Sequence, residues 1–384
     1  MEVVVKKRKK GFKNIFNSVS KVKIDGLSLT VILAVFFLSV FGCIMVYSAT
    51  YYSSSLNGGN QYRFLIKQII GVVIGFCAMT FFYFFPYQKL KKFKWWAVLV
   101  ATILLILVFI PGIGVENYGA RRWIGLPGFT FQPSEIAKFV LVLFAAVHLA
   151  DNYENVKKFK TILPVLFVGA LFCALVILEP NMSITMCLGL TLIIMLFVGG
   201  ISLKNFLTLA LPGAALVPAL IFMEPYRIKR LMAFLDPWSS PKGEGFQLIQ
   251  SLYSLGSGGW FGVGLFNSRQ KYLFLPFCES DFIFSIIAEE IGFVGSVFVL
   301  LVYAVLIVAL IKIAKRATNR FAALFVCGVA VVISVQVLIN IAVVTGSIPP
   351  TGLPLPFLSA GSTSLMVFMS SVGICLNVRK QSKY

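Results

Sequence analysis

The sequence predicts an all-α polytopic membrane protein with about ten transmembrane helices, and three observations carry this prediction. Of its 384 residues, 59% are hydrophobic and only 12% are charged, which is about half the charged fraction of an average soluble protein. The apolar residues gather in runs that reach the roughly 20 residues needed to cross a bilayer. Most of the 34 lysines and arginines stand between these runs. This composition excludes a disordered chain and disfavours an ordinary water-soluble domain.

Ten apolar runs reach the length of a membrane-spanning helix. They cover residues of about 27–48, 65–85, 95–114, 134–150, 161–178, 182–199, 204–223, 282–311, 321–346 and 357–378. The first run follows a strongly basic segment and is too long for a removable signal peptide, so we expect a retained signal anchor. Because no hydrophilic stretch is long enough for a second core, we expect one membrane domain at 27–378. Residues 1–26 and 379–384 are then its tails.

The distribution of basic residues predicts how the chain faces the membrane. Ten spans put both termini on the same side, together with the loops near 86–94, 151–160, 200–204 and 312–320. These segments hold most of the 34 lysines and arginines. The positive-inside rule therefore places both termini in the cytoplasm. The net charge of +20 is then explained by topology and by contact with anionic membrane lipids, and no nucleic-acid role is expected.

Cysteine and histidine usage gives little basis for a metal or redox enzyme. There are seven cysteines, with no C-x-x-C pair among them, and one histidine, His148. All the cysteines except Cys278 fall inside apolar runs, so a disulfide framework is not expected. A haem, zinc or di-iron site has no cluster of ligands from which to form. We predict no metal site.

Polar motifs gather in two outer loops, at 111–133 and 224–281. The second loop separates the seventh and eighth spans and is rich in aromatic and apolar residues, so we expect it to be large, ordered and extracytoplasmic. It contains the stretch Gly256-Ser-Gly-Gly-Trp-Phe-Gly-Val-Gly264. This stretch lacks the Gly-Lys-Ser/Thr ending of a phosphate loop and fits no G-x-G-x-x-G frame. Close approach of backbones at the membrane surface is therefore favoured over a nucleotide site.

Asp281 stands where the second loop ends and the eighth span begins, which permits two interpretations. It is either a cap of the helix N-terminus or a functional carboxylate. On the predicted helix, Glu289 lies about 80° and 12 Å from Asp281, and Glu290 faces the opposite side. Both are too deep to share a glycosidic bond with Asp281, for which carboxyl separations run about 5–9.5 Å. We expect a single-carboxylate site at Asp281, with Glu289 in helix packing or an ion pair.

Two further stretches place polar groups within the membrane. The fourth span carries Glu135 and Lys138, which fit either an internal ion pair or a functional pair shielded from lipid. Four prolines in the segment 346–364 exclude a continuous helix between the ninth and tenth spans. Residues Ser359 to Ser364 then begin the tenth helix. Their hydroxyls and free amides suit an anion site or simple helix capping.

These motifs closely resemble one family, the shape, elongation, division and sporulation (SEDS) proteins of the FtsW/RodA/SpoVE group. The resemblance covers most of the chain, in order. It rests on Gly119-Ala-Arg-Arg-Trp-Ile124, Phe131-Gln-Pro-Ser-Glu135, Glu179-Pro-Asn-Met182, Gly245-Phe-Gln247, Gly256-Ser-Gly-Gly259, Ser280-Asp-Phe-Ile-Phe284, Ala288-Glu-Glu-Ile-Gly292 and Pro350-Thr-Gly-Leu-Pro-Leu-Pro-Phe357. The segment 268–272 and the basic N-terminus look more like the FtsW/SpoVE branch.

The resemblance implies a peptidoglycan glycosyltransferase of the bacterial cytoplasmic membrane. Such an enzyme polymerises lipid II into glycan strands at the outer face, for cell division or cell shape, with a class B penicillin-binding protein as the partner transpeptidase. The family's catalytic aspartate corresponds to Asp281, which would act as general base on the acceptor sugar hydroxyl. The substrate-binding candidates that the resemblance implies are Arg121, Arg122, Trp123, Glu135, Lys271, Ser359 and Ser364.

The chemistry of these side chains suggests which part of the substrate each would bind. The guanidinium and ammonium groups of Arg121, Arg122 and Lys271 suit pyrophosphate oxygens. Trp123 would stack on a sugar or pack at the membrane interface. A divalent cation such as Mg²⁺ could bridge the pyrophosphate, although the sequence shows no dedicated carboxylate cage for it.

Three departures from the family pattern keep other functions open. Asn181 replaces the aspartate of a Pro-Asp-x-Gly motif, Phe277 replaces a glutamate, and Ala360-Gly-Ser362 interrupts the usual Ser-Tyr-Gly-Gly-Ser-Ser. A lipid II flippase remains an alternative, since broken backbone within a membrane is typical of transporters. A non-catalytic scaffold of the division or elongation machinery is a second alternative. The polymerase is favoured because the polar motifs concentrate at the outer face and the Asp281 motif is intact.

Overall fold

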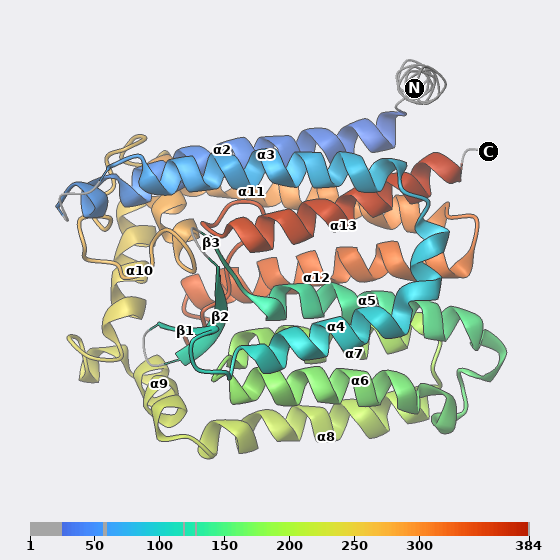
Figure 1. The fold of residues 1–384 in the computed structure, drawn as a ribbon. Coiled ribbons are helices and arrows are strands. Elements are labelled where there is room, and N and C mark those ends of the chain that lie inside the picture. Colours follow the sequence, from blue (N-terminus) through green and yellow to red (C-terminus); the bar gives the residue numbers. More distant parts are fainter. Residues whose placement is uncertain (1–24, 57–59, 118–119, 127–128, 383–384) are drawn as a thin grey trace.

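The computed structural model describes residues 25–56, 60–117, 120–126 and 129–382. Long helices dominate it and run roughly side by side (Figure 1). The helices at the ten predicted spans are α2 (Gly26–Leu56), α3 (Arg63–Phe84), α4 (Lys94–Leu107), α5 (Pro133–Asp151), α6 (Phe159–Leu178), α7 (Met182–Gly199), α8 (Leu203–Phe222), α11 (Ile283–Lys315), α12 (Arg320–Val344) and α13 (Ser362–Gln381). Short 3-10 turns, η1 (Tyr87–Phe93) and η2 (Tyr153–Asn155), connect some of them.

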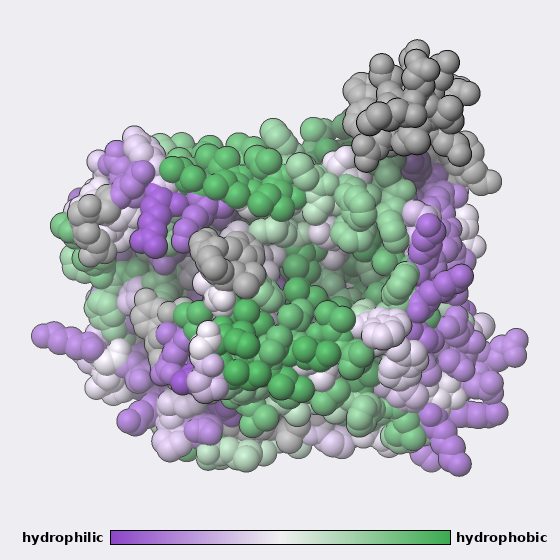
Figure 2. Space-filling model, in the orientation of Figure 1, coloured by the Kyte–Doolittle hydropathy of each residue, from purple (hydrophilic) through white to green (hydrophobic). Residues whose placement is uncertain are grey.

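The surface of this bundle matches a bilayer. Among the described helices, seven are long and apolar enough to cross a membrane. Figure 2 shows a broad apolar band over the middle of the face it presents, with hydrophilic residues at both ends. Large side chains such as Phe167 and Leu338 are each 69% exposed in this molecule, which lipid tolerates and water does not. α4, α8 and α13 fall outside the seven, so ten crossings stay a prediction.

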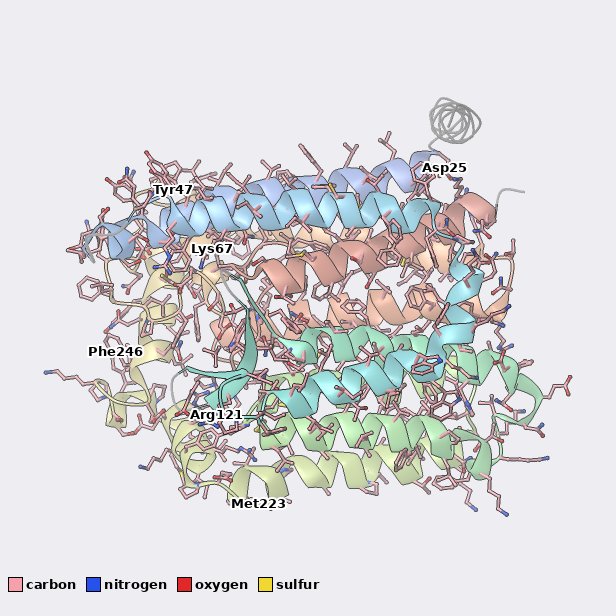
Figure 3. The ribbon with its side chains drawn as sticks, in the orientation of Figure 1. Asp25, Tyr47, Lys67, Arg121, Met223 and Phe246 are labelled. Atoms are coloured by element: carbon pink, nitrogen blue, oxygen red, sulfur yellow. The ribbon has the colours of Figure 1, made fainter. Side chains whose placement is uncertain are left out.

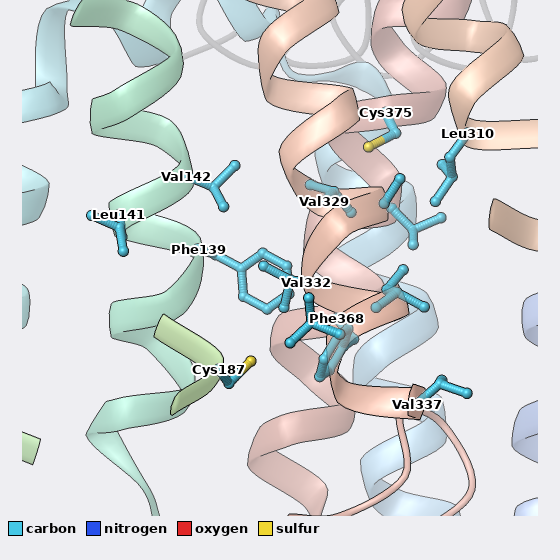
Figure 4. Close-up of a cluster of buried hydrophobic side chains, with 14 of the residues drawn as sticks. Phe139, Leu141, Val142, Cys187, Leu310, Val329, Val332, Val337, Phe368 and Cys375 are labelled. Atoms are coloured by element: carbon cyan, nitrogen blue, oxygen red, sulfur yellow. The ribbon is translucent and has the colours of Figure 1, made fainter. Parts of the chain in front are cut away.

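The core lies where α5, α7, α12 and α13 meet. Most side chains of α5 are buried, which confirms that the fourth predicted span is shielded by other helices. Phe139 of α5 and Phe368 of α13 pack edge to face with ring centroids 5.0 Å apart. Figure 4 shows these rings with Val142, Val332 and Cys187 around them. Apolar residues on all sides of α5 thus exclude lipid from its polar groups.

The two ends of the bundle differ in what they carry. The start of α2 and the end of α13 lie at one end, where Asp25 and Arg379 form an ion pair of 2.6 Å. The opposite end carries the strands together with α9 (Pro225–Leu235) and α10 (Phe246–Gly258). Figure 3 shows Asp25 at one end, and Arg121 and Phe246 at the other. Functional motifs from distant parts of the chain therefore collect at one end.

The loop 111–133 contains a small β-sheet, so the prediction of an all-α fold is wrong in this region. Strands β1 (Gly114–Asn117), β2 (Ala120–Leu126) and β3 (Phe129–Phe131) pair antiparallel in the order β1-β2-β3. Ile124 lies opposite Gly114 on one side and Phe131 on the other. β-Branched and aromatic residues in two short runs favour strands once they pair, but these runs are too short to stand out beside the spans.

The loop 224–281 is structured by α9, η3 (Pro237–Ser239) and α10. After α10, its glycine-rich stretch packs against a break in α11, where Gly292 has a φ of 68°. A Cβ on Gly262 would lie 2.2 Å from the Glu290 carbonyl oxygen, so only glycine fits there. The amide of Val263 donates to the Glu289 carbonyl at 2.9 Å. The expectation of close backbone approach in this stretch is confirmed.

Candidate active site

A cavity of about 660 Å³ lies at the end of the bundle that carries the strands and α9. Its polar lining includes Arg122, Gln132, Asn181, Ser183, Tyr226, Arg227, Arg230, Gln247, Glu279, Ser280, Asp281 and Thr351. Apolar residues of α7 and α8, Met186 and Ile221, line it as well. The cavity therefore combines charged groups with an apolar wall, as a site for an amphiphilic ligand requires.

Asp281 lines this cavity from the turn before α11. The helix begins at Ile283, its N-cap residue is Phe282, and no side chain caps it. The interpretation of Asp281 as a helix cap is therefore wrong, and its carboxylate is not engaged in capping. Burial is the main cause that raises the pKa of Asp281 to about 7, and the neighbouring Glu279 raises it further.

Cations oppose this effect on Asp281. Arg122 and Arg230 both lower its pKa, although burial outweighs them. A carboxyl group with a pKa near neutrality suits a general base, because a large fraction is ionised near neutral pH and the ionised form accepts a proton well. The physical environment thus fits the role that the sequence predicts for Asp281.

Strand β2 decides which arginine reaches the cavity. Arg121 pairs with Glu116 and Trp123 pairs with Val115, so Arg122 between them has no partner in β1 and is the extra residue of a β-bulge, which re-aims side chains. Arg122 lines the cavity, where its Nε donates to the Glu179 carbonyl at 3.2 Å and its Nη2 donates to the Pro180 carbonyl. Arg121 instead forms an ion pair of 3.2 Å with Glu116 at the surface. Among the described residues of this motif, Ala120, Arg122 and Trp123 reach the lining, and Arg121 does not.

Helix α9 supplies two more cations. Pro225 stands in its first turn, where its missing N–H costs nothing. Arg227 and Arg230 are three residues apart and share one face of the helix, which faces the cavity. Arg227 donates to the Tyr226 hydroxyl at 3.0 Å. Among the described residues, Arg230 makes one long hydrogen bond, 3.4 Å, to the Pro350 carbonyl, so its guanidinium is available to a ligand.

Glu179 stands at the end of α6, beside the cavity lining. Its side chain is 1% exposed, and neither carboxyl oxygen has a hydrogen-bond partner among the described residues. Burial raises its pKa to about 8, with Arg122 opposing. At neutral pH the group is therefore mostly uncharged and leaves the positive charge of Arg122 uncompensated.

The structure places Lys271 away from the cavity. Its ammonium is buried and pairs with Glu290 at 3.1 Å, and it donates to the Ser48 hydroxyl at 3.1 Å. Because this lysine neutralises an internal carboxylate, we correct its expected role in substrate binding to a structural one. The partner, 19 residues away on α11, could not be identified from spacing.

Glu135, Ser359 and Ser364 also bind other parts of the protein. Glu135 pairs with Lys138 at 2.9 Å and accepts a hydrogen bond from the Ser364 hydroxyl at 2.7 Å. The Ser359 hydroxyl donates to the Ser280 carbonyl at 2.5 Å. None of the three lines the cavity. Helix α13 begins at Ser362 without a side-chain cap, so the alternative of simple capping by Ser359 or Ser364 is also wrong.

Glu289 fits the internal role expected of it. It accepts hydrogen bonds from the Ser268 hydroxyl at 2.5 Å, from the Arg269 amide at 2.9 Å and from the Ser254 hydroxyl at 3.2 Å. These bonds fasten the loop before Asp281 to α11. Glu289 does not line the cavity of Asp281.

Several lining residues are not among those favoured from the sequence. Arg230 and Tyr226 belong to a helix that was not predicted, although a proline followed by arginines three apart is a detectable signal. Asn181 lines the cavity and also caps α7 by accepting the Ile184 amide at 3.3 Å. The departure from aspartate at this position therefore keeps the capping function and removes one negative charge from the cavity.

Comparisons with known proteins agree with this architecture. A family model described as a cell cycle protein, covering FtsW, RodA and SpoVE, matches residues 29–384. The chain is 39% identical to the stage V sporulation protein E of Bacillus subtilis, over 93% of this chain and 97% of that protein. It is 37% identical to a probable peptidoglycan glycosyltransferase FtsW of Geobacter sp. strain M18, again over 93% and 97%.

Solved structures share the fold. A chain described under "Structural coordination of polymerization and crosslinking by a peptidoglycan synthase complex" superposes with a TM-score of 0.75 at 28% identity, covering 92% of this chain and 97% of that one. The rod shape determining protein RodA of Thermus thermophilus gives a TM-score of 0.70 at 24% identity, over 95% and 99%. The chain thus belongs to the FtsW/RodA/SpoVE family of SEDS proteins, on its FtsW/SpoVE-like branch.

Proposed function

We propose that the protein is a peptidoglycan glycosyltransferase that polymerises lipid II, with Asp281 as its general base. The observation that carries this proposal is the joint placement of Asp281, Arg122 and Arg230 in one cavity with an apolar wall. A lipid-linked sugar pyrophosphate needs a proton acceptor, cations for phosphate and an apolar surface. Relatives named as peptidoglycan glycosyltransferases, at 37% identity over 93% of this chain, support the same activity.

In the proposed reaction, Asp281 accepts the proton of the acceptor sugar hydroxyl. The hydroxyl oxygen forms a bond to the donor's anomeric carbon, and the bond from that carbon to the pyrophosphate oxygen breaks. The leaving undecaprenyl pyrophosphate takes the bonding electrons. Arg122, Arg227 and Arg230 would stabilise the negative charge that develops there, because guanidinium forks match phosphate oxygens. Trp123, which lines the same cavity, would contact the sugar.

No step of this reaction is assigned to a divalent cation. Among the described residues, no three His, Cys, Asp or Glu side chains gather to hold a metal ion. Magnesium is often bound by one or two carboxylates together with substrate phosphates, and Glu279 and Asp281 are the carboxylates in the lining. Such an ion would therefore enter only with the pyrophosphate.

We further propose that the cavity opens at the outer face of the bacterial cytoplasmic membrane and that both tails are cytoplasmic. The basic loops at the opposite end of the bundle support this orientation. A class B penicillin-binding protein is the proposed partner, because a chain of similar fold belongs to a complex that coordinates polymerisation and crosslinking. The glycan strand would be handed to it at the outer face.

The test uses the full chain with fluorescent lipid II, alone and with candidate transpeptidases. Asp281→Asn keeps the side-chain shape but removes the basic carboxylate, so polymerisation should fall by about two to four orders of magnitude. Asp236→Asn, at an exposed position after α9, is the matched control and should stay near wild type. A folded Asp281→Asn protein that still makes glycan strands at a near wild-type rate would refute the mechanism.

The same assay separates the alternatives. If the wild type moves lipid II between leaflets of a vesicle without elongating it, the flippase replaces the polymerase. The position of the charged cavity at one end of the bundle, and not halfway along it, disfavours a transport site. A scaffold would neither polymerise nor move lipid II, yet would still bind the transpeptidase.

A further inference from the structure

The segment 349–361 lies against the turn that carries Asp281. Four of its residues are prolines, which fix φ and leave few amide donors. At Gly352 a Cβ would lie 2.6 Å from the Asp281 Oδ2, and beyond its two chain neighbours the only described atoms within 4 Å of it belong to Asp281. Glycine at this position therefore leaves room for the carboxylate.

Three consecutive backbone carbonyl groups in the turn that carries Asp281, those of residues 279–281, each accept a hydrogen bond from a distant part of the chain. The Ala360 amide donates to the Glu279 carbonyl at 2.9 Å. The Ser359 hydroxyl donates to the Ser280 carbonyl at 2.5 Å. The Asn340 side-chain amide donates to the Asp281 carbonyl at 2.8 Å. A short turn with every carbonyl bound has little freedom to rotate.

Asn340 also joins this turn to the proline-rich segment. Its Nδ2 donates a second hydrogen bond, of 2.7 Å, to the Leu353 carbonyl, next to Gly352. The side chain is 1% exposed and does not line the cavity. One buried amide group on α12 therefore sets the distance between Asp281 and the residue that faces its carboxylate.

The proline-rich segment is itself anchored in the core. Gln336 donates to the Pro354 carbonyl at 2.7 Å and accepts a hydrogen bond from the Lys138 ammonium at 2.6 Å. Tyr303 of α11 donates to the Pro356 carbonyl. The intramembrane pair of Lys138 and Glu135 thus connects through Gln336 to the segment that packs on Asp281, although it contacts no part of the cavity.

We propose that Asn340 and Gly352 are positioning residues that fix the direction of the Asp281 carboxylate in the cavity. The proposal rests on the proposed role of Asp281 as general base, and adds that the segment 349–361 serves as a rigid template for that base. Ordinary van der Waals contact begins at 3.4 Å, so Gly352→Ala must displace the carboxylate by about 0.8 Å. A misplacement of about 1 Å at a reacting group costs on the order of 10²-fold in rate.

Two variants of the full chain test this: Gly352→Ala, and Asn340→Ala, which lies outside the cavity lining. We expect kcat for lipid II polymerisation to fall by roughly 10- to 100-fold in each, while the KM for lipid II stays near wild type. The melting temperature should stay near wild type in Gly352→Ala and fall in Asn340→Ala, because two carbonyl groups lose a buried donor there. Gly189→Ala on α7, outside the segment and the cavity lining, is the matched control, because no described atom beyond its own helix backbone and chain neighbours lies within 4 Å of its Cβ. It should retain wild-type kcat.

A pH profile distinguishes positioning from a general structural role. In Asn340→Ala the loosened carboxylate becomes better solvated, so the acidic limb of kcat against pH should move to lower pH. Folded variants with wild-type kcat, or a limb that does not move while kcat falls, would overturn the proposal. A rise in KM that accounts for the whole loss would also overturn it, because the residues would then act on binding.

Asp281→Asn is measured in parallel. If it retains polymerisation, the proposed function of Asp281 fails, whatever the other variants do. If it is inactive and Gly352→Ala and Asn340→Ala are fully active, only the positioning proposal fails. Should Asn340→Ala not fold, Gly352→Ala decides alone, since its added methyl meets only Asp281.

Discussion

The ionisation of Asp281 predicts a specific pH dependence of polymerisation. Its pKa of about 7 arises mainly from burial and further from Glu279, and only the ionised form accepts a proton. A group with this pKa is about one-tenth ionised at pH 6 and about nine-tenths ionised at pH 8. We therefore expect kcat/KM for lipid II to rise about tenfold between these pH values.

Removing a charge near Asp281 should shift the acidic limb of the profile of kcat/KM against pH. The sign of the removed charge determines the direction of the shift. Glu279→Gln removes a negative charge, so the pKa of Asp281 falls and the limb moves to lower pH. Arg230→Met removes a positive charge that lowers this pKa, so the limb moves to higher pH. Glu244→Gln, at an exposed position of the same loop, should leave it in place.

The assay is initial-rate polymerisation of fluorescent lipid II from pH 5.5 to 8.5 at constant ionic strength, with melting temperature measured at each pH. Arg230→Met also weakens phosphate binding in the proposed mechanism, so the position of the limb is compared and not the absolute rate. A flat profile for the folded wild type would refute the reasoning. Shifts of the same sign in Glu279→Gln and Arg230→Met would refute the assigned electrostatics.

Two further predictions concern stability. Glu179 has its pKa raised from 4.5 to about 8, so its contribution to stability is fully present below pH 4.5 and is lost as pH rises to 8. Glu179→Gln should therefore stabilise the fold by up to about 3 kcal/mol at pH 7, and an equal melting-temperature gain at pH 5 and pH 8 would contradict this. Lys271→Met leaves the buried Glu290 unpaired and should cost about 3–5 kcal/mol. The double variant Lys271→Met with Glu290→Gln should melt higher than Lys271→Met alone. An equal or lower melting temperature would refute the stabilising role of this ion pair.

Much of the fold was predictable because helix formation and membrane insertion depend on local sequence. Apolar runs of spanning length satisfy their backbone hydrogen bonds within one segment, so their positions follow from composition alone. The predicted run 182–199 coincides with α7 (Met182–Gly199). The predicted start of the eighth span at 282 lies one residue before the start of α11 at Ile283. The resemblance of the motifs to the SEDS family was likewise contained in the order of residues, and the comparisons confirm it.

The composition of the site depended on contacts between residues far apart in the chain. Arg121 and Arg122 are adjacent, and only the pairing of β2 decides that Arg122 faces the cavity. In the sequence Lys271 fits a phosphate-binding residue, but in the structure its ammonium binds Glu290 and Ser48. Asn340 meets the Asp281 carbonyl across 59 residues, and no periodicity encodes such a contact. Burial and charge neutralisation are properties of the packed structure, so only the tertiary structure decided which polar side chains are available to a ligand.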